Sequence, residues 1–205
     1  MANQHQLDQF KQGREAWNTW RKQHPSLRPD LSGADLSGAD FSQADLTRTI
    51  FRQANLAGVW LKEANLSGAF FREANLSRAN LSRANLSGAI LSFADGKQAS
   101  FGGANLSDAN LSQTDLSDTD FSQADLSRAN LSGADLSRAN LSGAILKQTD
   151  LGGTNLSDAN LSHADLSGAD LSGADLRGAW LNNTKLDKTL ITKEQIGQAK
   201  PDMHV

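Results

Sequence analysis

Residues 121–146 read FSQADLSRANLSGADLSRANLSGAIL, and the five-residue pattern in this stretch continues along the chain in both directions. From Leu31 to Ile191 every fifth residue is Leu, Phe or Ile, without an insertion and with Gly96 as the one exception. The residue two positions earlier is small, mostly Ala and otherwise chiefly Thr. Asp or Asn usually stands between the two, and Ser usually follows. The chain is therefore built on a repeating unit A-(D/N)-L-S-x.

A period of five fits neither of the regular secondary structures. Five residues of an α-helix rotate a side chain by about 500°, so each Leu would lie roughly 140° from the previous one and no apolar stripe would form. Along a straight strand an odd spacing alternates between the two faces, which would expose half of the leucines. A chain that turns a corner every five residues buries all of them.

Four such sides make a square coil of 20 residues, and about eight coils fit between Leu31 and Ile191. The Leu and the small residue point inward. Asp, Asn, Ser and Gly suit tight corners, because they bond to nearby backbone or tolerate a positive φ. Successive coils stack through sheet-like hydrogen bonds at about 4.8 Å per coil. The sequence thus predicts an all-β solenoid.

The unbroken A-(D/N)-L-S-x register resembles the pentapeptide repeat family, and the resemblance covers residues 31–191, about four-fifths of the chain. It implies a right-handed quadrilateral β-helix, with a handedness that the periodicity alone does not supply. The family is abundant in cyanobacteria, and the chain is similar to members of that type. Most members of the family have no known biochemical activity, so the resemblance implies a fold more strongly than a function.

The repeat is absent at the N-terminal end, where a helix is expected over residues 3–24. Leu7, Phe10, Trp17 and Trp20 recur there at spacings that favour one face of a helix, and two prolines follow. The terminal coils of a solenoid need caps, because they would otherwise expose the core and unpaired backbone. We therefore interpret residues 1–28 as a helical cap whose aromatic side chains cover the first coil.

At the C-terminal end the residues from Thr192 to Gln195 fit a capping box that opens a short helix through Ala199. Pro201 ends this helix, and residues 201–205 are expected to fray. The expected organisation is a helical cap over residues 1–28, a β-helix over 29–191, and a short helix with a tail over 192–205.

Residues 20 apart in the sequence lie one above another in adjacent coils. We therefore expect Phe51 to pack on Phe71, and Phe101 on Phe121, inside the core. These stacked rings are ordinary core packing rather than a cofactor site.

Gly96 stands where the repeat requires a large inward-facing side chain. Replacing a buried Leu by a small residue typically costs ~2–5 kcal/mol when a cavity remains. We expect an irregular corner or a bend near residues 93–98, with Phe93 or a local bulge filling the gap. On this hypothesis Gly96→Leu is stabilising or neutral.

The outward position before each central residue is usually polar, but three successive coils place Ile50, Phe70 and Ile90 in one column. Trp60 and Trp180 share a second outward column, which we take to neighbour the first. Apolar patches on a polar surface often mark interaction sites. The alternatives are that a loop covers the column, or that stacked apolar residues only stabilise the coils. The candidate partner-binding residues are Ile50, Phe70, Ile90, Trp60 and Phe93.

Charge is unevenly distributed along the repeat. Residues 31–90 carry six basic and five acidic side chains, whereas residues 91–191 carry seven basic and thirteen acidic ones. Lys and Arg are absent between residues 98 and 127, where five aspartates are expected to point outward: Asp108, Asp115, Asp118, Asp120 and Asp125. The acidic half therefore resembles family members that mimic duplex DNA and bind a type II topoisomerase such as DNA gyrase.

Three observations weaken that comparison. The repeat prefers Asp at its corners whatever the function, and Asn is as common as Asp at that position. Members with this activity are usually dimers joined at their C-terminal ends, and the C-terminal end of this chain offers no obvious large apolar surface. DNA mimicry is therefore kept as the alternative.

The composition excludes several classes of function. The chain has no Cys, so disulfides, thiolate metal sites and cysteine nucleophiles are absent. The histidines at positions 5, 24, 163 and 204 show no metal-ligand spacing, and none is expected beside a serine nucleophile. A core of Leu and Ala leaves no cavity for a substrate. We expect no catalytic, metal-binding or cofactor-binding residues.

The remaining features concern partners and location. A net charge of −3 argues against general nucleic-acid binding, and no stretch approaches the ~20 consecutive apolar residues of a membrane span. The first residues lack the basic and apolar regions of a secretory signal. We expect a cytoplasmic monomer.

These observations favour a non-enzymatic scaffold that binds a protein partner, not yet identified, through its outer faces. Inhibition or protection of DNA gyrase by DNA mimicry is the alternative. A purely structural role, with rods stacked end to end, is disfavoured because caps prevent such stacking.

Overall fold

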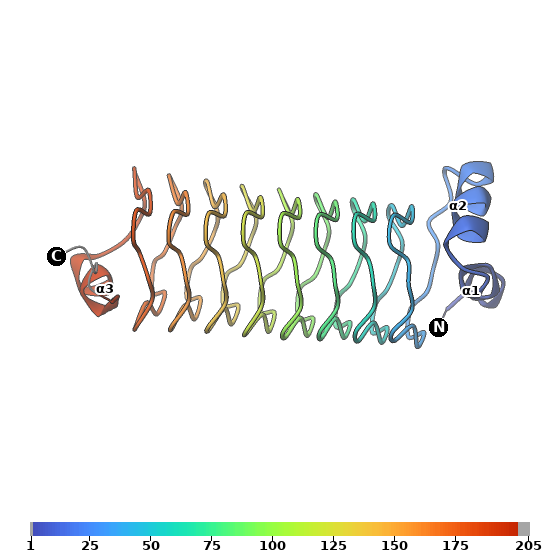
Figure 1. Cartoon of the computed structure of the whole chain (residues 1–205), viewed down its shortest axis with the longest axis horizontal. Helices are drawn as coiled ribbons and strands as arrows, with labels where there is room; N and C mark the ends of the chain where they lie inside the picture. The colour runs from blue at the N-terminus through green and yellow to red at the C-terminus, as the bar shows by residue number, and fades with distance from the viewer. Residues whose placement is uncertain (1, 201–205) are drawn as a thin grey trace.

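The computed structural model describes residues 2–200. Figure 1 shows a rod of stacked coils with helical segments at both ends. The tail at residues 201–205, for which fraying was expected, lies outside the described residues. None of the helices in residues 2–200 is long and apolar enough to span a membrane.

The coils are joined by parallel bridges between residues 20 apart. The bridges form four ladders. Ladder I contains every twentieth residue from 30 to 190, ladder II from 35 to 175, ladder III from 40 to 200, and ladder IV from 45 to 185. Each coil therefore has four sides, as the five-residue period predicts.

Within residues 2–200 the bridges stay isolated and no extended strand forms. Each side contributes one bridging residue, such as Asp150. Its N–H donates to the Ala129 carbonyl (3.0 Å), and its carbonyl accepts from the Leu131 N–H (2.8 Å). A corner every five residues bends the chain before a second residue pair can align. The solenoid is of the β type in its hydrogen bonding, but it lacks the continuous strands that an all-β class implies.

The ladder residues also close the corners that follow them. The Asp120 Oδ1 atom accepts the Ser122 N–H (2.9 Å), and the Asn130 Oδ1 atom accepts the N–H and the O–H of Ser132 (2.9 and 2.7 Å). The next residue turns the chain in the left-handed region, as Gly133 does with φ 64°. Asp and Asn are frequent on the ladders because their side chains satisfy corner N–H groups.

The inward-facing Leu and Phe residues are buried from Leu31 to Leu176. The predicted stacking is confirmed: the rings of Phe51 and Phe71 lie 5.0 Å apart at 10°. The Phe101 and Phe121 rings lie 4.8 Å apart at 5°. Each fully buried side chain of this kind contributes ~1.5–3 kcal/mol, so this column of side chains is the main source of stability.

Threonines replace Ala at some inward positions, and their hydroxyls bond across coils. Thr149 Oγ1 donates to the Leu126 carbonyl (2.8 Å), which lies 23 residues earlier. Thr49 occupies the equivalent position in the first coil, but its buried hydroxyl has no hydrogen-bond partner among residues 2–200. The residue 23 positions before Thr49 is Ser26, which precedes the first coil. The carbonyl 23 residues earlier, which Thr149 uses, is therefore missing from the coils for this hydroxyl.

Two helices stand at the N-terminal end, where one continuous helix over residues 3–24 was predicted. They are α1 (Gln4–Lys11) and α2 (Arg14–Gln23). The prediction of a single helix is wrong because the chain turns at Gly13, whose φ of 93° breaks the helical path. Both helices contact the first coil: the Phe10 ring stacks on Phe41 with centroids 3.4 Å apart, and Trp17 Nε1 donates to the Asp45 carbonyl (2.7 Å).

The C-terminal helix α3 (Lys193–Gln198) confirms the predicted capping box. The Thr192 side chain accepts the Gln195 N–H (3.1 Å), and the Gln195 side chain accepts the Thr192 N–H (2.9 Å). The Gln195 Nε2 group also donates to the carbonyls of Leu171 (2.6 Å) and Ala174 (3.0 Å). A glutamine side chain thus replaces the backbone donors that another coil would supply.

The predicted irregularity at Gly96 is wrong. The Gly96 N–H donates to the Asp115 carbonyl (2.7 Å), and both flanking ladder bridges of Asp95 are regular. Leu116 of the next coil fills the space, since its Cδ2 atom would lie 2.9 Å from a Cβ at position 96. Phe93 does not fill it, because Phe93 sits at a corner and is 53% exposed.

Candidate protein-binding surface

The surface of the rod offers one run of apolar ladder residues. Ile50, Phe70 and Ile90 are bridged consecutively in ladder I, between Asp30 and Asn110. All three are half-buried. We call these three residues the apolar strip. It replaces three successive polar corner groups, so it is a departure from the repeat rather than a consequence of it.

Arginine side chains lie over the apolar strip and beside it. The Arg28 guanidinium is 4.7 Å from the centre of the Phe70 ring. Arg72 lies 5.4 Å from the ring of Phe93, which occupies the corner that follows Ile90. Such contacts between a cation and a ring face are favourable. They leave Phe93 exposed and Phe70 partly covered.

Trp60 does not belong to this surface. It is 54% exposed, but it lies in ladder III together with Trp180. Ladders I and III are two sides apart, so Trp60 and the apolar strip are on opposite sides of the four-sided coil. The prediction that the two columns are neighbours is wrong, because ten residues advance the chain by two corners. Ile50, Phe70, Ile90 and Phe93 share a surface without Trp60.

Four arginines concentrate positive charge near the apolar strip, at positions 28, 48, 52 and 72, and all four are exposed. Of these four arginines, only Arg72 forms an ion pair with another described residue, Glu73 (3.2 Å). A hydrogen bond from Gln53, together with the charges of Arg72 and Arg52, holds the pKa of Glu73 below its ordinary value. Sequence analysis missed this feature, although residues 52 and 72 are 20 apart and therefore share one corner.

The acidic half of the rod does not form one acidic face. Asp115, Asp120 and Asp125 belong to ladders II, III and IV respectively, so they point to three different sides. Asp108 and Asp118 are each bound by an arginine one coil further on, Arg128 and Arg138, at distances of 2.6–2.8 Å. Hydrogen bonds from these arginines lower the pKa values of both carboxyls. The negative charge is dispersed around the rod and partly neutralised.

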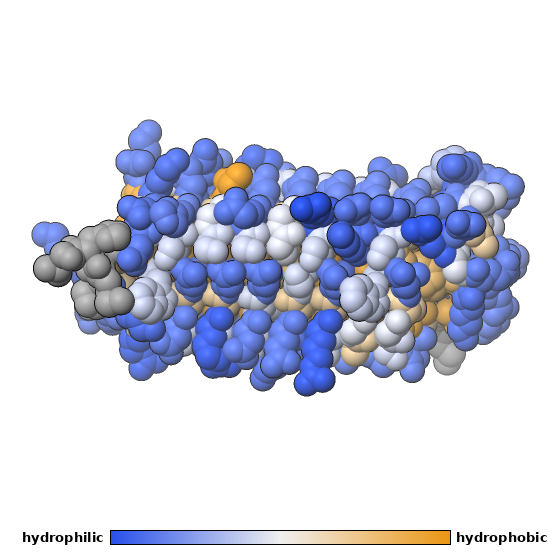
Figure 2. All heavy atoms as spheres, in the orientation of Figure 1, coloured by the Kyte–Doolittle hydropathy of each residue, from blue (hydrophilic) through white to orange (hydrophobic). Residues whose placement is uncertain are grey.

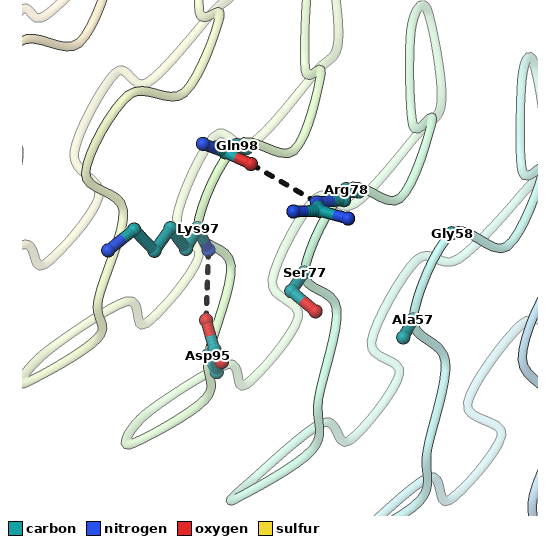
Figure 3. Close-up of a pocket in the computed structure, with 7 residues that line it drawn as sticks. All are labelled: Ala57, Gly58, Ser77, Arg78, Asp95, Lys97 and Gln98. Carbon is teal, nitrogen blue, oxygen red and sulfur yellow. Dashed lines mark hydrogen bonds between the residues drawn. The ribbon is translucent and has the colours of Figure 1, made fainter.

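A shallow hollow of about 450 Å³ lies at the corner between ladders II and III (Figure 3). Arg78 Nε donates to Gln98 Oε1 (3.2 Å), and the Lys97 N–H donates to Asp95 Oδ1 (3.0 Å). Figure 3 shows the Lys97 side chain extending away from these groups rather than into the hollow. Arg78 and Asp95 form hydrogen bonds within the corner, and the charged groups that line the hollow do not converge on one point.

The described residues contain no group of three or more His, Asp or Glu side chains that could hold a metal ion. Figure 2 shows one face of the rod, and hydrophilic residues cover most of it. Hydrophobic atoms gather there where the N-terminal helices meet the coils. The architecture is that of a repeat scaffold, a class of protein that presents side chains on a preformed surface.

The chain belongs to the pentapeptide repeat family. A family model described as pentapeptide repeats matches in eight copies, over residues 30–68, 54–92, 97–138, 114–153, 134–173 and 154–192. Membership implies a right-handed sense for the solenoid. A comparison with curated proteins found no match.

Solved structures of other pentapeptide repeat proteins resemble the chain. Full-length QnrB1, a plasmid-mediated fluoroquinolone resistance protein, is 22% identical, with a TM-score of 0.68 over 82% of this chain and 96% of QnrB1. HetL, involved in heterocyst differentiation regulation in the cyanobacterium Nostoc sp. strain PCC 7120, is 28% identical, with a TM-score of 0.43 over 83% of this chain and 92% of HetL. The likeness to QnrB1 supports the fold.

Proposed function

We propose that this protein is a non-enzymatic scaffold that binds a protein partner through the apolar strip and Phe93. The observation that carries the proposal is the run of Ile50, Phe70 and Ile90 on three consecutive rungs of ladder I. The repeat favours Asp or Asn there for corner hydrogen bonds, so apolar residues forgo that stabilisation. A contiguous apolar surface that is open to solvent in part is a common mark of protein contact.

The charge around the strip indicates what the partner carries. Arg28, Arg48 and Arg52 form no ion pair among the described residues, and they surround the strip together with Arg72. A partner with apolar residues flanked by Asp or Glu would complement this surface. Complementary charge raises the association rate and selects the partner. A rigid rod loses little conformational entropy when it binds, which favours affinity.

The proposal extends to the organisation of the chain. The helical segment of residues 1–28 and the segment of residues 192–205 protect the two ends of the β-helix of residues 29–191, and the binding form is a monomer. Both caps replace missing coil partners with side chains, as Gln195 does.

Affinity capture from source-cell lysate tests the proposal with wild type beside the triple variant Ile50→Asn, Phe70→Asn and Ile90→Asn. Asn is the residue that the repeat uses at this position, so the variant should retain the fold. Ile145→Asn is the matched control, because Ile145 is a 40% exposed ladder residue on ladder IV. We expect a partner that wild type and the control retain and the triple variant loses. A partner that all three proteins retain equally would refute the role of the apolar strip in binding.

The second candidate function is inhibition or protection of DNA gyrase. The likeness to full-length QnrB1 supports it at the level of the fold. The dispersal of Asp115, Asp120 and Asp125 over three sides speaks against an extended acidic face. A gyrase supercoiling assay with and without a fluoroquinolone separates the candidates. Inhibition or relief of drug inhibition at modest protein concentration would favour this function, and no effect would exclude it.

A further inference from the structure

The first coil ends the rod on the N-terminal side, and α1 closes its ladder I position. The Asp30 N–H donates to Gln6 Oε1 (2.7 Å), and the Asp30 carbonyl accepts the N–H of Asn3, the N-cap of α1 (2.8 Å). These groups stand in for the preceding coil that the rod lacks. The backbone at ladder I is therefore satisfied.

Helix α2 closes the ladder IV position in the same way. The Asp45 N–H donates to Asn18 Oδ1 (2.8 Å), and the Asp45 carbonyl accepts Trp17 Nε1–H (2.7 Å). At the adjoining corner Arg21 Nη2 donates to the Thr47 carbonyl (3.2 Å). Two of the four sides of the first coil are thus capped by hydrogen bonds that imitate a further coil.

The other two sides are open. The backbone N–H and carbonyl groups of Asp35, on ladder II, and Asp40, on ladder III, have no hydrogen-bond partner among residues 2–200. One coil further on, the equivalent backbone groups of Asn55 are paired. The Asn55 N–H donates to the Ala34 carbonyl (2.9 Å), and the Asn55 carbonyl accepts the Leu36 N–H (2.8 Å). An unpaired edge of this kind is a template for an added extended segment.

A hollow with both apolar and polar lining residues adjoins the open edge. Its lining includes Phe10 of α1 and Leu36, Ala39 and Phe41 of the first coil, and its volume is about 320 Å³. Ala39 is half-buried, whereas Ala79, at the same position two coils further on, is 1% exposed. Hydrophobic atoms are visible at this junction of helices and coils in Figure 2. An additional half-coil would place inward-facing residues here, and one of them would lie over Phe41, where the Phe10 ring now stacks.

Two carboxylates stand at the open ladder positions, although Lys11 lines the hollow and Arg14 lies near Asp40. Asp35 and Asp40 are exposed, and hydrogen bonds from the serine two residues further on hold the pKa values of both carboxyls below the ordinary value. Both are therefore negatively charged at neutral pH. The rod itself shows that Lys can pair with such a group, as Asn55 does with Asp35 (2.9 Å), because Lys185 is bridged to Asp165 one coil away with Nζ 3.6 Å from Oδ2.

We propose that this open half of the first coil binds an extended segment of a partner protein by strand addition. The segment carries Lys or Arg in register with Asp35 and Asp40, and a Leu-sized residue after each of them enters the hollow. The second of these residues takes the place over Phe41 that the Phe10 ring occupies in the free chain. Its backbone accepts from the two free N–H groups and donates to the two free carbonyls. This surface lies at the end of the rod and is separate from the apolar strip, so it does not depend on the function proposed above.

A blocked synthetic peptide, AKLSGAKL, tests the proposal against the full chain labelled with ¹⁵N. It copies the repeat, with Lys at the two ladder positions. We expect titration to the millimolar range to shift amide signals of the first coil and α1. We also expect hydrogen exchange at the Asp35 and Asp40 amides to slow by about tenfold or more, since each becomes a donor.

Two altered peptides distinguish strand addition from other attachment. AELSGAEL places Glu opposite the two aspartates and should bind at least about tenfold more weakly. The parent peptide N-methylated at both Leu residues cannot donate to the Asp35 and Asp40 carbonyls, and should not bind. On the protein side, Asp35→Asn with Asp40→Asn should weaken binding of the Lys peptide while leaving binding of ANLSGANL unchanged.

Several outcomes would overturn the proposal. These are no change at Asp35 and Asp40 with millimolar peptide, equal binding of the N-methylated peptide, or shifts located elsewhere on the rod. Slow exchange of these two amides in the free chain, with a molecular weight in solution twice that of the monomer, would identify a second copy as the occupant instead.

Discussion

Thr49 offers the most direct test of how the rod is held together. Its hydroxyl is fully buried and unpartnered in the described part of the chain, whereas the Thr149 hydroxyl donates to the Leu126 carbonyl (2.8 Å). Val has nearly the shape of Thr but no hydroxyl. Thr49→Val therefore removes an unsatisfied polar group, and Thr149→Val removes a hydrogen bond at an equivalent position.

The two substitutions should change the free energy of unfolding in opposite directions. A buried, unsatisfied polar group costs ~1–3 kcal/mol, so Thr49→Val should stabilise the protein by about 1–2 kcal/mol. A satisfied hydrogen bond contributes ~0.5–1.5 kcal/mol, so Thr149→Val should destabilise it by up to about 1 kcal/mol. The loss is limited because the Leu126 carbonyl still accepts the Ala129 N–H (3.0 Å).

Urea unfolding followed by tryptophan fluorescence measures both effects. Trp17 and Trp20 are buried against the N-terminal coils, close to the coil of Thr49. In a repeat protein stability is nearly a sum of local terms, so the unfolding slope should stay constant while the midpoint moves. A Thr49→Val variant no more stable than wild type, or equal shifts for both variants, would refute the assignment of Thr49 as an unsatisfied group.

The other predictions concern the core, the caps and pH. Gly96→Leu should lower the free energy of unfolding by about 1–3 kcal/mol, because Leu116 already occupies the space; a gain in thermal stability would restore the cavity hypothesis. Thr192→Ala removes the capping box with Gln195 and should cost about 1 kcal/mol, whereas Thr192→Ser should not change the unfolding midpoint. Hydrogen bonds from the serine two residues further on lower the pKa values of several ladder carboxyls. These carboxylates therefore stabilise the folded protein above the unfolded pKa, near 3.9, and the stabilisation is lost as the pH falls through the lower pKa values of the folded state. Unfolding midpoints should therefore hold between about pH 5 and 7 and fall below about pH 4, and a constant midpoint down to pH 2 would contradict the role of Asp35, Asp165 and Asp170.

The five-residue period is sufficient to predict most of the fold. It specifies which residues face inward, which residues stack 20 apart, and the four-sided coil, because each corner forces the same local geometry. The pairs Phe51–Phe71 and Phe101–Phe121 follow from this arithmetic alone. The capping box at Thr192 was equally predictable, since it depends on residues three apart.

The candidate surface was only partly predictable. The column of Ile50, Phe70 and Ile90 follows from the period, and the position of Trp60 two corners away should have followed from it as well. The position of Arg28 over the Phe70 ring could not be predicted from the period, because Arg28 precedes the first coil and lies outside the repeat.

The sequence alone determined the structure of the repeating coils, because a residue at a given position of the repeat contacts equivalent neighbours in every coil. What only the tertiary structure decided lies where that symmetry ends. Leu116 fills the space above Gly96 by a choice of side-chain position that no local pattern encodes. The helices α1 and α2 close ladders I and IV of the first coil and leave Asp35 and Asp40 open, because the turn at Gly13 sets where each helix lies. These contacts join residues far apart in sequence, and each occurs only once among residues 2–200.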